Sequence, residues 1–249
     1  MDNKFEIVLI GSGYYVCGGK KKDYGTILPA ILTFSKIHKI SIEIIVAINR
    51  NESADIFSEK FNHLRELLNI HDLVTYKFIY CKGSSKNFIA EYSKNHKIVA
   101  GIISIPDHLH FEWSKILLEL KIPILVVKPL TLKLEESNKL LNLSKKFSTP
   151  IFVEFHKRFD RQLKYAKDCF CKELIGTPLY SFTEYTQRKE VPLENFRSWV
   201  EKSNIFSYLG VHYVDAIKYI TESTPRRVSA IGQKYFLKSK GVDTFDSVQ

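Results

Sequence analysis

Residues 5–150 alternate short runs of β-branched and apolar residues with longer amphipathic segments, and this alternation constrains the fold most strongly. The expected strands are residues 5–10, 41–48, 76–80, 98–104 and 123–127, and the expected helices are residues 26–37, 54–68, 86–95, 108–120 and 132–147. A regular strand–helix alternation requires right-handed crossovers, which make the sheet parallel and cover both of its faces with helices. We therefore predict a doubly wound α/β domain over residues 1–150.

The pattern changes in the remaining part of the chain. Residues 150–155 predict one more strand, and a long helix is expected after Arg158. A strand near 179–187, a helix near 205–221 and a strand near 226–236 follow, without an internal repeat or a low-complexity linker. We therefore place a domain boundary near residue 150 and predict a second α/β domain over residues 151–249. Residues 242–249 resemble the start of a strand, so this domain is expected to be incomplete at its C-terminal end.

The composition indicates an ordinary soluble protein. The chain has 249 residues, of which 45% are hydrophobic and 26% charged, which is enough for one large domain or two smaller ones. The longest apolar run, residues 98–105, is much shorter than the roughly 20 residues of a membrane span, and no signal peptide is visible. The four cysteines lack metal-site spacing. These features predict reduced thiols in a cytoplasmic protein without a metal site.

The net charge of +10 raises the question of nucleic-acid binding, because lysine and arginine neutralise phosphates. The lysines are scattered along the expected helix faces, however, so we predict no nucleic-acid partner. A basic field also steers an anionic cofactor or a sugar-phosphate-like substrate toward a cleft.

A glycine-containing turn closes the first expected strand, in the sequence Ile10-Gly11-Ser12-Gly13-Tyr14. Glycine permits a tight turn and a close approach of backbone N–H groups to a pyrophosphate. The third glycine of the common Gly-x-Gly-x-x-Gly pattern is absent, because that position is Val16. A purely structural turn is the alternative, but its place after the first strand of a βαβ series favours binding of a nucleotide at residues 11–14.

Asn49 and Arg50 follow the second expected strand, where NAD-preferring sites usually carry an acidic residue. The amide of Asn49 can bond a ribose or phosphate oxygen, and the forked guanidinium of Arg50 suits a phosphate. We predict NADP as the preferred cofactor, with NAD as the alternative. In the other interpretation, Arg50 is a solvated loop residue.

Two further segments lie where parallel strands end and ligands bind in open α/β folds. The first is Ser104-Ile105-Pro106, followed by His110, and the second is Lys128-Pro129. We expect both segments to contact the cofactor. His110 is the least specific of these residues, because a packed or capping histidine explains it equally well.

Taken together, five short segments make the chain resemble the Gfo/Idh/MocA family of oxidoreductases. They are Gly11-x-Gly13, Ile105-Pro-Asp-His-Leu-His110, Lys128-Pro129, His156-Lys-Arg-Phe-Asp160 and Gly210-x-His212-x-x-Asp215. Each segment is weak alone, but their order and spacing extend the resemblance over nearly the whole chain.

The resemblance implies a Rossmann domain followed by an α/β domain with an open, mostly antiparallel sheet, and often assembly into dimers or tetramers. It implies that Lys128 positions the substrate beside the nicotinamide and that His212 is the acid–base residue. These roles suit the chemistry, because oxidising a carbinol needs a base for the hydroxyl proton and a nearby ammonium stabilises an alkoxide. The remaining substrate-binding residues implied are His156, Arg158 and Asp215.

Two residues depart from the family pattern. Val127 replaces the glutamate of Glu-Lys-Pro, and Tyr208 stands four residues before His212, where many members have a substrate-binding aspartate. Residues four apart on a helix share a face, so the Tyr208 phenol is a candidate for donating or relaying a proton. Packed or solvated roles for Lys128 and His212 remain the structural alternatives.

These observations predict an NAD(P)-dependent oxidoreductase acting on a CH–OH group of a sugar, cyclitol or related carbohydrate-like substrate. One alternative is a regulatory or assembly protein that binds a nucleotide without turnover, which Val127 and Tyr208 favour. A glycosidase-like relative that uses NAD for transient oxidation is another.

Overall fold

The computed structural model describes residues 4–19, 23–81 and 85–249. The chain divides into two compact units, Met1–Val153 and Glu154–Gln249. No helix among the described residues is long and apolar enough to cross a membrane.

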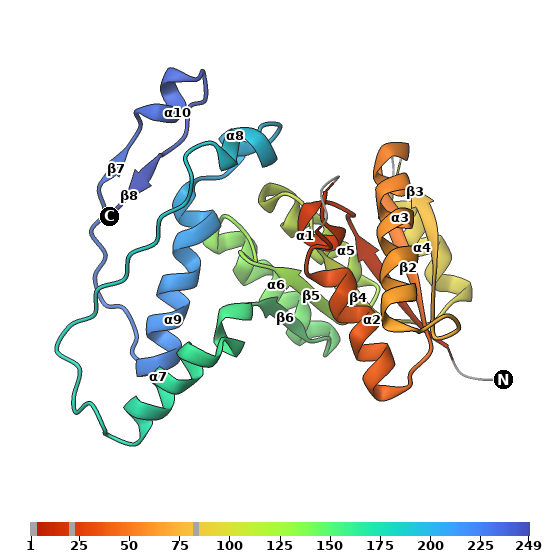
Figure 1. Cartoon of the computed structure of the whole chain (residues 1–249), viewed down its shortest axis with the longest axis horizontal. Coiled ribbons are helices and arrows are strands. Elements are labelled where there is room, and N and C mark those ends of the chain that lie inside the picture. Colours follow the sequence, from red (N-terminus) through yellow and green to blue (C-terminus); the bar gives the residue numbers. More distant parts are fainter. Residues whose placement is uncertain (1–3, 20–22, 82–84) are drawn as a thin grey trace. The chain divides into compact units, whose positions relative to one another are not determined.

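A six-stranded sheet organises the first unit, in the order β3-β2-β1-β4-β5-β6 (Figure 1). Its strands are β1 (Phe5–Ile10), β2 (Ile42–Ile48), β3 (Val74–Tyr80), β4 (Ile98–Ile103), β5 (Ile124–Val127) and β6 (Ile151–Glu154). β1 pairs in parallel with β2 and β4, β2 with β3, and β4 with β5. The predicted parallel, doubly wound sheet is confirmed, and the order of its strands changes direction between β1 and β4.

Helices cover both faces of this sheet because its strands are apolar on both sides. They are α1 (Tyr14–Cys17), α2 (Ile27–His38), α3 (Asn51–Leu68), α4 (Ser85–Asn95), the 3₁₀ turn η1 (Asp107–Leu109), α5 (His110–Glu119) and α6 (Leu134–Phe147). Ile7 and Leu9 of β1 pack with α2 and α3, whereas Val8 and Ile10 pack with α4, α5 and α6. The alternation of side chains along one strand therefore separates two hydrophobic cores.

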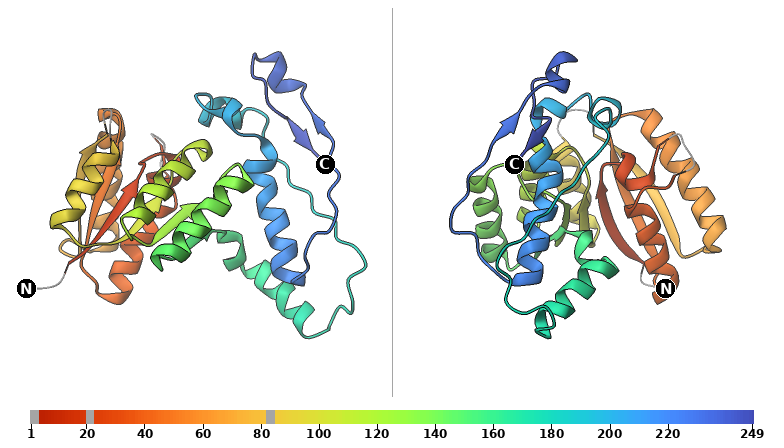
Figure 2. Two further views of the ribbon diagram at one scale, coloured as in Figure 1. Left: turned by 180° about the vertical axis from the view of Figure 1, so that it is seen from behind. Right: turned by 60° about the vertical axis from the view of Figure 1, so that its left-hand side comes forward.

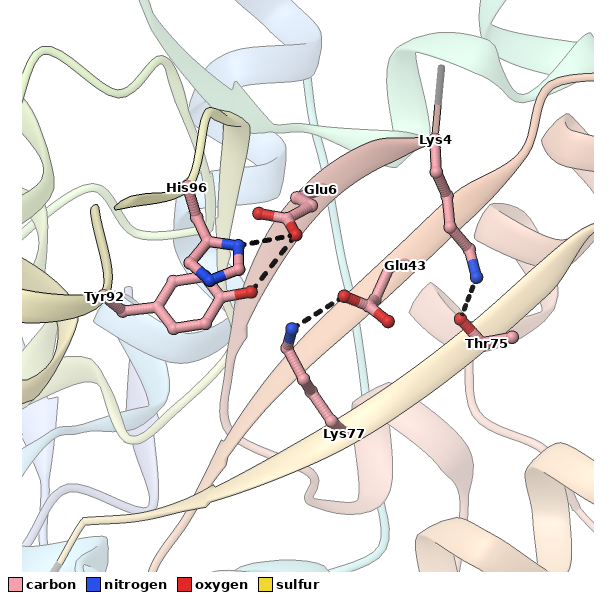
Figure 3. A network of polar contacts seen from close by, with 7 residues as sticks. All are labelled: Lys4, Glu6, Glu43, Thr75, Lys77, Tyr92 and His96. Carbon is pink, nitrogen blue, oxygen red and sulfur yellow. Dashed lines mark hydrogen bonds and ion pairs between the residues drawn. The ribbon is translucent and has the colours of Figure 1, made fainter. Parts of the chain in front are cut away.

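Polar side chains connect the N-terminal halves of the strands to α4 (Figure 3). Lys77 donates a hydrogen bond to Glu43 at 2.7 Å. The phenol of Tyr92 donates to Glu6 at 3.2 Å, and Nδ1 of His96 lies 3.0 Å from the same carboxylate. This network lies at the end of the sheet opposite the glycine turn.

The second unit consists mainly of helices and irregular chain (Figure 2). Its elements are η2 (His156–Phe159), α7 (Arg161–Cys171), α8 (Val191–Asn195), η3 (Val200–Lys202), the π-helical turn η4 (Phe206–Gly210), α9 (Val211–Thr221), β7 (Gly232–Gln233), α10 (Phe236–Ser239) and β8 (Ser247–Val248). α7 and α9 pack side by side, and β7 and β8 form a two-stranded antiparallel sheet.

The sequence predicted more strand in this unit than the structure contains. The expected strand near 179–187 is irregular and exposed, and only Gly232–Gln233 form a strand within the expected range 226–236. A strand needs a neighbouring strand for its backbone hydrogen bonds. Within residues 155–249, the structure shows strand pairing only between β7 and β8. The helix expected over 205–221 forms in two parts, η4 and α9.

Candidate functional site

The turn after β1 packs against the end of β4 at the position where the strand order reverses. Gly11 has a φ of 100°, and a Cβ at this position would overlap the carbonyl oxygen of Ser104 and lie 2.8 Å from Cγ2 of Ile105. Its N–H donates to the carbonyl of Ala47 at 3.1 Å. Only glycine fits this conformation and this spacing without strain, so the turn is fixed by three strands.

The short helix α1 follows directly, and Gly13 occupies its N-cap position with a φ of −77°. Val16, which replaces the third glycine of the common pattern, is completely buried in the core shared with α2 and α3. The valine side chain therefore faces the protein interior. Val16 therefore does not fill the space beside Gly13, which is open, since a Cβ on Gly13 would meet no atom within 4 Å.

A cavity of about 250 Å³ opens beside this turn. It is lined by residues of the turn and of the segment entering α3: Ser12, Gly13, Tyr14, Gly18, Gly19, Arg50, Glu52, Ser53 and Ile56. Ligands of open α/β sheets bind outside the carboxyl ends of the strands near the reversal of strand order. This cavity has that location and is the candidate nucleotide-binding site.

Arg50 and Glu52 bring opposite charges to this cavity. A guanidinium attracts a 2′-phosphate, whereas a carboxylate repels it and accepts hydrogen bonds from ribose hydroxyls. Asn49 is exposed. Glu52 was not among the predicted site residues, because the helix was expected to begin at residue 54, whereas α3 begins at Asn51.

Tyr14 is more than half exposed at the cavity. A hydrogen bond with Asp23 raises the pKa of the Tyr14 phenol and lowers the pKa of the Asp23 carboxyl. The N–H of Gly19 also donates to Asp23 at 3.0 Å. Asp23 therefore holds together two segments that line the cavity.

A larger cavity, of about 460 Å³, lies at the other end of the sheet, between residues 93–98 and 120–122. These residues precede β4 and β5, so the cavity is at the amino ends of the strands. Its size does not make it the better candidate, because ligands of this fold class bind at the carboxyl ends.

The segments after β4 and β5 are joined by His110, the first residue of α5. Its side chain is 1% exposed. Nδ1 lies 2.6 Å from the carbonyl oxygen of Pro129, and Nε2 lies 2.8 Å from that of Ile105. Lys128 is buried, and the Lys128–Pro129 peptide bond is cis. The ring of His110 thus contacts the backbone on both sides.

The second unit brings together the four residues that sequence analysis assigned to the substrate there. His156 and Arg158 lie on η2, and His212 and Asp215 lie one helical turn apart on α9. The rings of His156 and His212 are 4.9 Å apart in an edge-to-face arrangement. His212 and Asp215 are both buried.

Arg158 binds Asp215 through a two-pronged ion pair. Nε donates to one carboxylate oxygen at 2.8 Å and an Nη donates to the other at 2.5 Å. This hydrogen bonding raises the pKa of Arg158. Because the guanidinium occupies both carboxylate oxygens, the pair joins η2 to α9 in a fixed orientation.

Two neighbours of the histidines, Glu154 and Phe155, were not among the predicted site residues. Glu154 accepts from Nδ1 of His156, with the closest pair of atoms 3.1 Å apart, and the ring of Phe155 lies 6.3 Å from that of His212. Both come from the end of β6 and the turn after it. A carboxylate two residues before a predicted substrate histidine is the signal that would have identified Glu154.

Tyr208 lies in the π-helical turn η4, within an aromatic cluster. Its ring is 4.7 Å from that of Phe196 and 6.4 Å from that of Trp199. A π-turn has a wider repeat than an α-helix. The four-residue spacing used to place Tyr208 on the same face as His212 therefore does not apply across this turn.

The strand order and the glycine turn at its reversal define a Rossmann-fold nucleotide-binding protein. The chain belongs to the Gfo/Idh/MocA family, whose model, described as an oxidoreductase family with an NAD-binding Rossmann fold, matches residues 5–155. The resemblance predicted from the five short segments is thereby confirmed.

Individual relatives are distant. The chain is 24% identical over 124 residues to the rhizopine catabolism protein MocA of Rhizobium meliloti, covering 50% of this chain and 38% of that protein. Its fold is similar to that of myo-inositol 2-dehydrogenase from Lactobacillus plantarum, with a TM-score of 0.71, 16% identity, and coverage of 98% of this chain and 64% of that one.

An oxidoreductase from Agrobacterium radiobacter, solved in complex with NAD⁺, L-tartaric acid and magnesium, has a similar fold as well. The TM-score is 0.68 at 13% identity, over 99% of this chain and 62% of that chain. The chain thus spans less than two thirds of the length of these relatives. At such identities the structural similarity establishes the fold alone.

Proposed function

We propose that the chain carries the cofactor-binding and substrate-binding residues of an NAD(P)-dependent oxidoreductase that acts on a CH–OH group of a sugar or cyclitol. The observation that supports this most is the grouping of His156, Arg158, His212 and Asp215 on η2 and α9, in a chain of an NAD-binding family. Residues 1–150 are assigned to the cofactor and residues 151–249 to the substrate, in a domain whose two-stranded antiparallel sheet of β7 and β8 is proposed to be part of an open, mostly antiparallel sheet.

The turn at Gly11–Tyr14 and the segment at Ser104–Pro106 are proposed to hold the cofactor. A bound nicotinamide supplies a hydride acceptor or donor. In the oxidation direction, His212 takes the proton of the substrate hydroxyl, and the ammonium of Lys128 stabilises the negative charge that develops on its oxygen. His156 is assigned to substrate binding. Arg158 and Asp215 hold the two histidine-bearing segments together, and Tyr208 is a further candidate for moving the proton.

The cofactor preference is proposed to be NADP, with Arg50 binding the 2′-phosphate. Arg50→Ala should then weaken NADP binding by about 1.5–3 kcal/mol, the range for hydrogen bonds to charged groups, and leave NAD binding nearly unchanged. Glu52→Gln is the matched variant from the same cavity, and it should favour NADP over NAD. Calorimetric titration of both cofactors tests this, and equal losses for the two in Arg50→Ala would contradict the assignment.

The activity itself is tested by following the absorbance of the reduced nicotinamide during incubation with NADP or NAD and a panel of polyols that includes myo-inositol. Lys128→Met and His212→Ala should each lower turnover by roughly 10²- to 10⁴-fold, as expected for positioned acid–base groups. If both residues serve one reaction, the double variant should lose much less than the product of the single losses. Normal turnover in either single variant would contradict its assigned role.

Nucleotide binding without turnover is the second candidate function. It is favoured by Val127, which stands where the family has a glutamate, and by the few buried apolar side chains of the second unit. Calorimetric binding of either cofactor, combined with no turnover of any polyol, would support it.

The oligomeric state is proposed to be a homodimer or homotetramer. Several large apolar side chains of the second unit are exposed in the single chain, among them Leu179, Tyr180 and Phe182. Large apolar side chains that are exposed in a single chain are often covered by a partner. Light scattering after size-exclusion chromatography should give a mass of two or four chains, and a monomer at all concentrations would contradict this proposal.

A further inference from the structure

His110 is buried beside the predicted cofactor and lysine segments, yet both of its ring nitrogens are directed at the main chain. At 1% exposure, with 2.6 Å from Nδ1 to the Pro129 carbonyl and 2.8 Å from Nε2 to the Ile105 carbonyl, the ring has no nitrogen left for a ligand. Its contacts are with the turns that follow β4 and β5.

These two turns continue into the glycine turn. Ile105 lies against Gly11, where a Cβ would be only 2.8 Å from its Cγ2. The N–H of Ser104 donates to the carbonyl of Ile10 at 3.0 Å. One continuous set of contacts therefore runs from the turn after β1, through the turn after β4, to His110 and the turn that carries Lys128.

Both partners of the ring are carbonyl oxygens, which only accept hydrogen bonds. A neutral imidazole has one N–H, so its second nitrogen would present a lone pair to a carbonyl oxygen. The imidazolium has two N–H groups and satisfies both carbonyls. Leaving a buried polar atom unsatisfied costs about 1–3 kcal/mol, and this cost opposes the desolvation that favours a neutral ring.

We propose that His110 is a positioning residue that donates hydrogen bonds from both ring nitrogens and thereby holds the Lys128–Pro129 turn at a fixed distance from the Ser104–Ile105 turn. It sets the place of Lys128 relative to the cofactor turn and does not touch the substrate or cofactor. Its effect on turnover rests on the proposed function, whereas its hydrogen bonding does not.

Several titratable groups lie on the segments that surround the ring. Asp107 and His108 lie on η1, Glu112 lies on α5, and Lys128 is adjacent to Pro129. Asp107 is buried and of opposite charge to an imidazolium, whereas Lys128 is buried and of like charge.

The structural arm of the test needs no substrate. In the ¹⁵N NMR spectrum of the full chain at pH 7, both ring nitrogens of His110 should carry protons. A ring with only one protonated nitrogen would overturn the proposal. In His110→Gln, amide exchange at Ile105 and Leu130 should accelerate at least about tenfold. Leu117→Ala, a substitution of a buried residue on the same helix, is the control for a general loss of stability. It should not change the exchange rates of these two amides relative to those of the other amides of the sheet.

The catalytic arm uses the polyol and cofactor that give turnover with the unaltered chain. His110→Gln should lower kcat by about 10- to 100-fold, as for residues that orient a functional group, and change the calorimetric Kd of the cofactor less than threefold. In the Lys128→Met background the same substitution should lower kcat less than threefold, because its effect passes through Lys128. If His110→Gln lowers kcat by the same factor in the unaltered chain and in the Lys128→Met variant, the positioning role is wrong. Absence of turnover in the unaltered chain contradicts the proposed function instead, and the NMR result still decides the hydrogen bonding.

Discussion

The two units of this chain hold their functional residues by different means. Apart from Val200, Leu237 and Val242, every buried apolar side chain in the described residues belongs to the first unit. The Gly11 turn therefore follows a strand whose two faces are both covered by packed side chains. In the second unit, the residues assigned to substrate are held mainly by an ion pair and by ring contacts. A large apolar core fixes backbone geometry cooperatively, whereas the second unit depends on a few polar contacts.

The comparison predicts that the first unit unfolds at higher denaturant concentration than the second. The only two tryptophans of the sequence allow each unit to be followed alone, because Trp113 lies on α5 and Trp199 lies in the second unit. Fluorescence of Trp113 in a Trp199→Phe background, and the reverse, should give two separate urea transitions. A single coincident transition would mean that the units are stabilised as one.

The largest expected effect is on the core of the first unit. Phe57 is fully buried and packs against Phe61, Tyr76 and Phe78. Phe57→Ala should lower the free energy of unfolding of this unit by about 3–5 kcal/mol, because it removes a large side chain and leaves a cavity. The measurement is urea denaturation followed at Trp113.

Val200→Ala is the corresponding change in the second unit, and it should cost about 1–2 kcal/mol, since it removes two methyl groups from a small core. Leu179→Ala, at 93% exposure, should change stability by less than about 0.5 kcal/mol. A loss at Val200 as large as that at Phe57 would show that the second core is more extensive than its buried side chains indicate.

The next effect concerns the glycine turn, where two neighbouring glycines should respond differently. Gly11→Ala forces a side chain into a positive-φ conformation and against the Ser104 carbonyl, so it should destabilise the first unit by on the order of 1–3 kcal/mol and weaken cofactor binding. Gly13→Ala, with a φ of −77° and open space around the added methyl, should cost less than about 0.5 kcal/mol of stability. Equal losses would contradict the geometry of the turn.

The third effect tests the polar contacts of the second unit. Asp215→Asn should lower the stability measured at Trp199 by about 1–2 kcal/mol. This is less than for a fully buried pair, because the Arg158 side chain is 43% exposed and can be hydrated. Glu222→Gln, which alters the exposed Lys167–Glu222 pair at 3.4 Å, is the control and should have almost no effect. A large loss in the control would indicate a general sensitivity to charge.

The secondary structure of the first unit was predicted from the sequence more successfully than that of the second. The strands of the first unit were predicted because runs such as residues 42–48 are apolar on both faces, a local property. The expected strand near 179–187 failed because strand formation depends on a partner, which no local pattern reveals. The pairing of Arg158 with Asp215 joins residues far apart in sequence, so sequence analysis assigned both to the substrate and missed their contact. Likewise, nothing in the residue types predicted the π-turn at Tyr208.

The smallest expected effect is on the acid stability of the first unit, through Glu43 (Figure 3). Burial alone would raise the pKa of this carboxyl, but the hydrogen bond and charge of Lys77 outweigh it and hold the pKa below its ordinary value. A carboxyl with a lower pKa in the folded than in the unfolded state stabilises the fold above the unfolded pKa, which is about 4.3 for glutamate. This stabilisation is lost as the pH falls through the folded pKa.

Glu43→Gln should therefore reduce stability at pH 7 by less than about 1 kcal/mol, because the Lys77 side chain is 37% exposed and the pair is partly screened. The difference between the variant and the unaltered chain should shrink as the pH is lowered from about 5 to 3, since protonation removes the same charge from Glu43. Urea midpoints followed at Trp113 over this range measure it. Glu91→Gln, which removes an exposed ion pair with Lys94, is the control. A difference that persists unchanged at pH 3 would mean that Glu43 stabilises the sheet by packing and not by its charge.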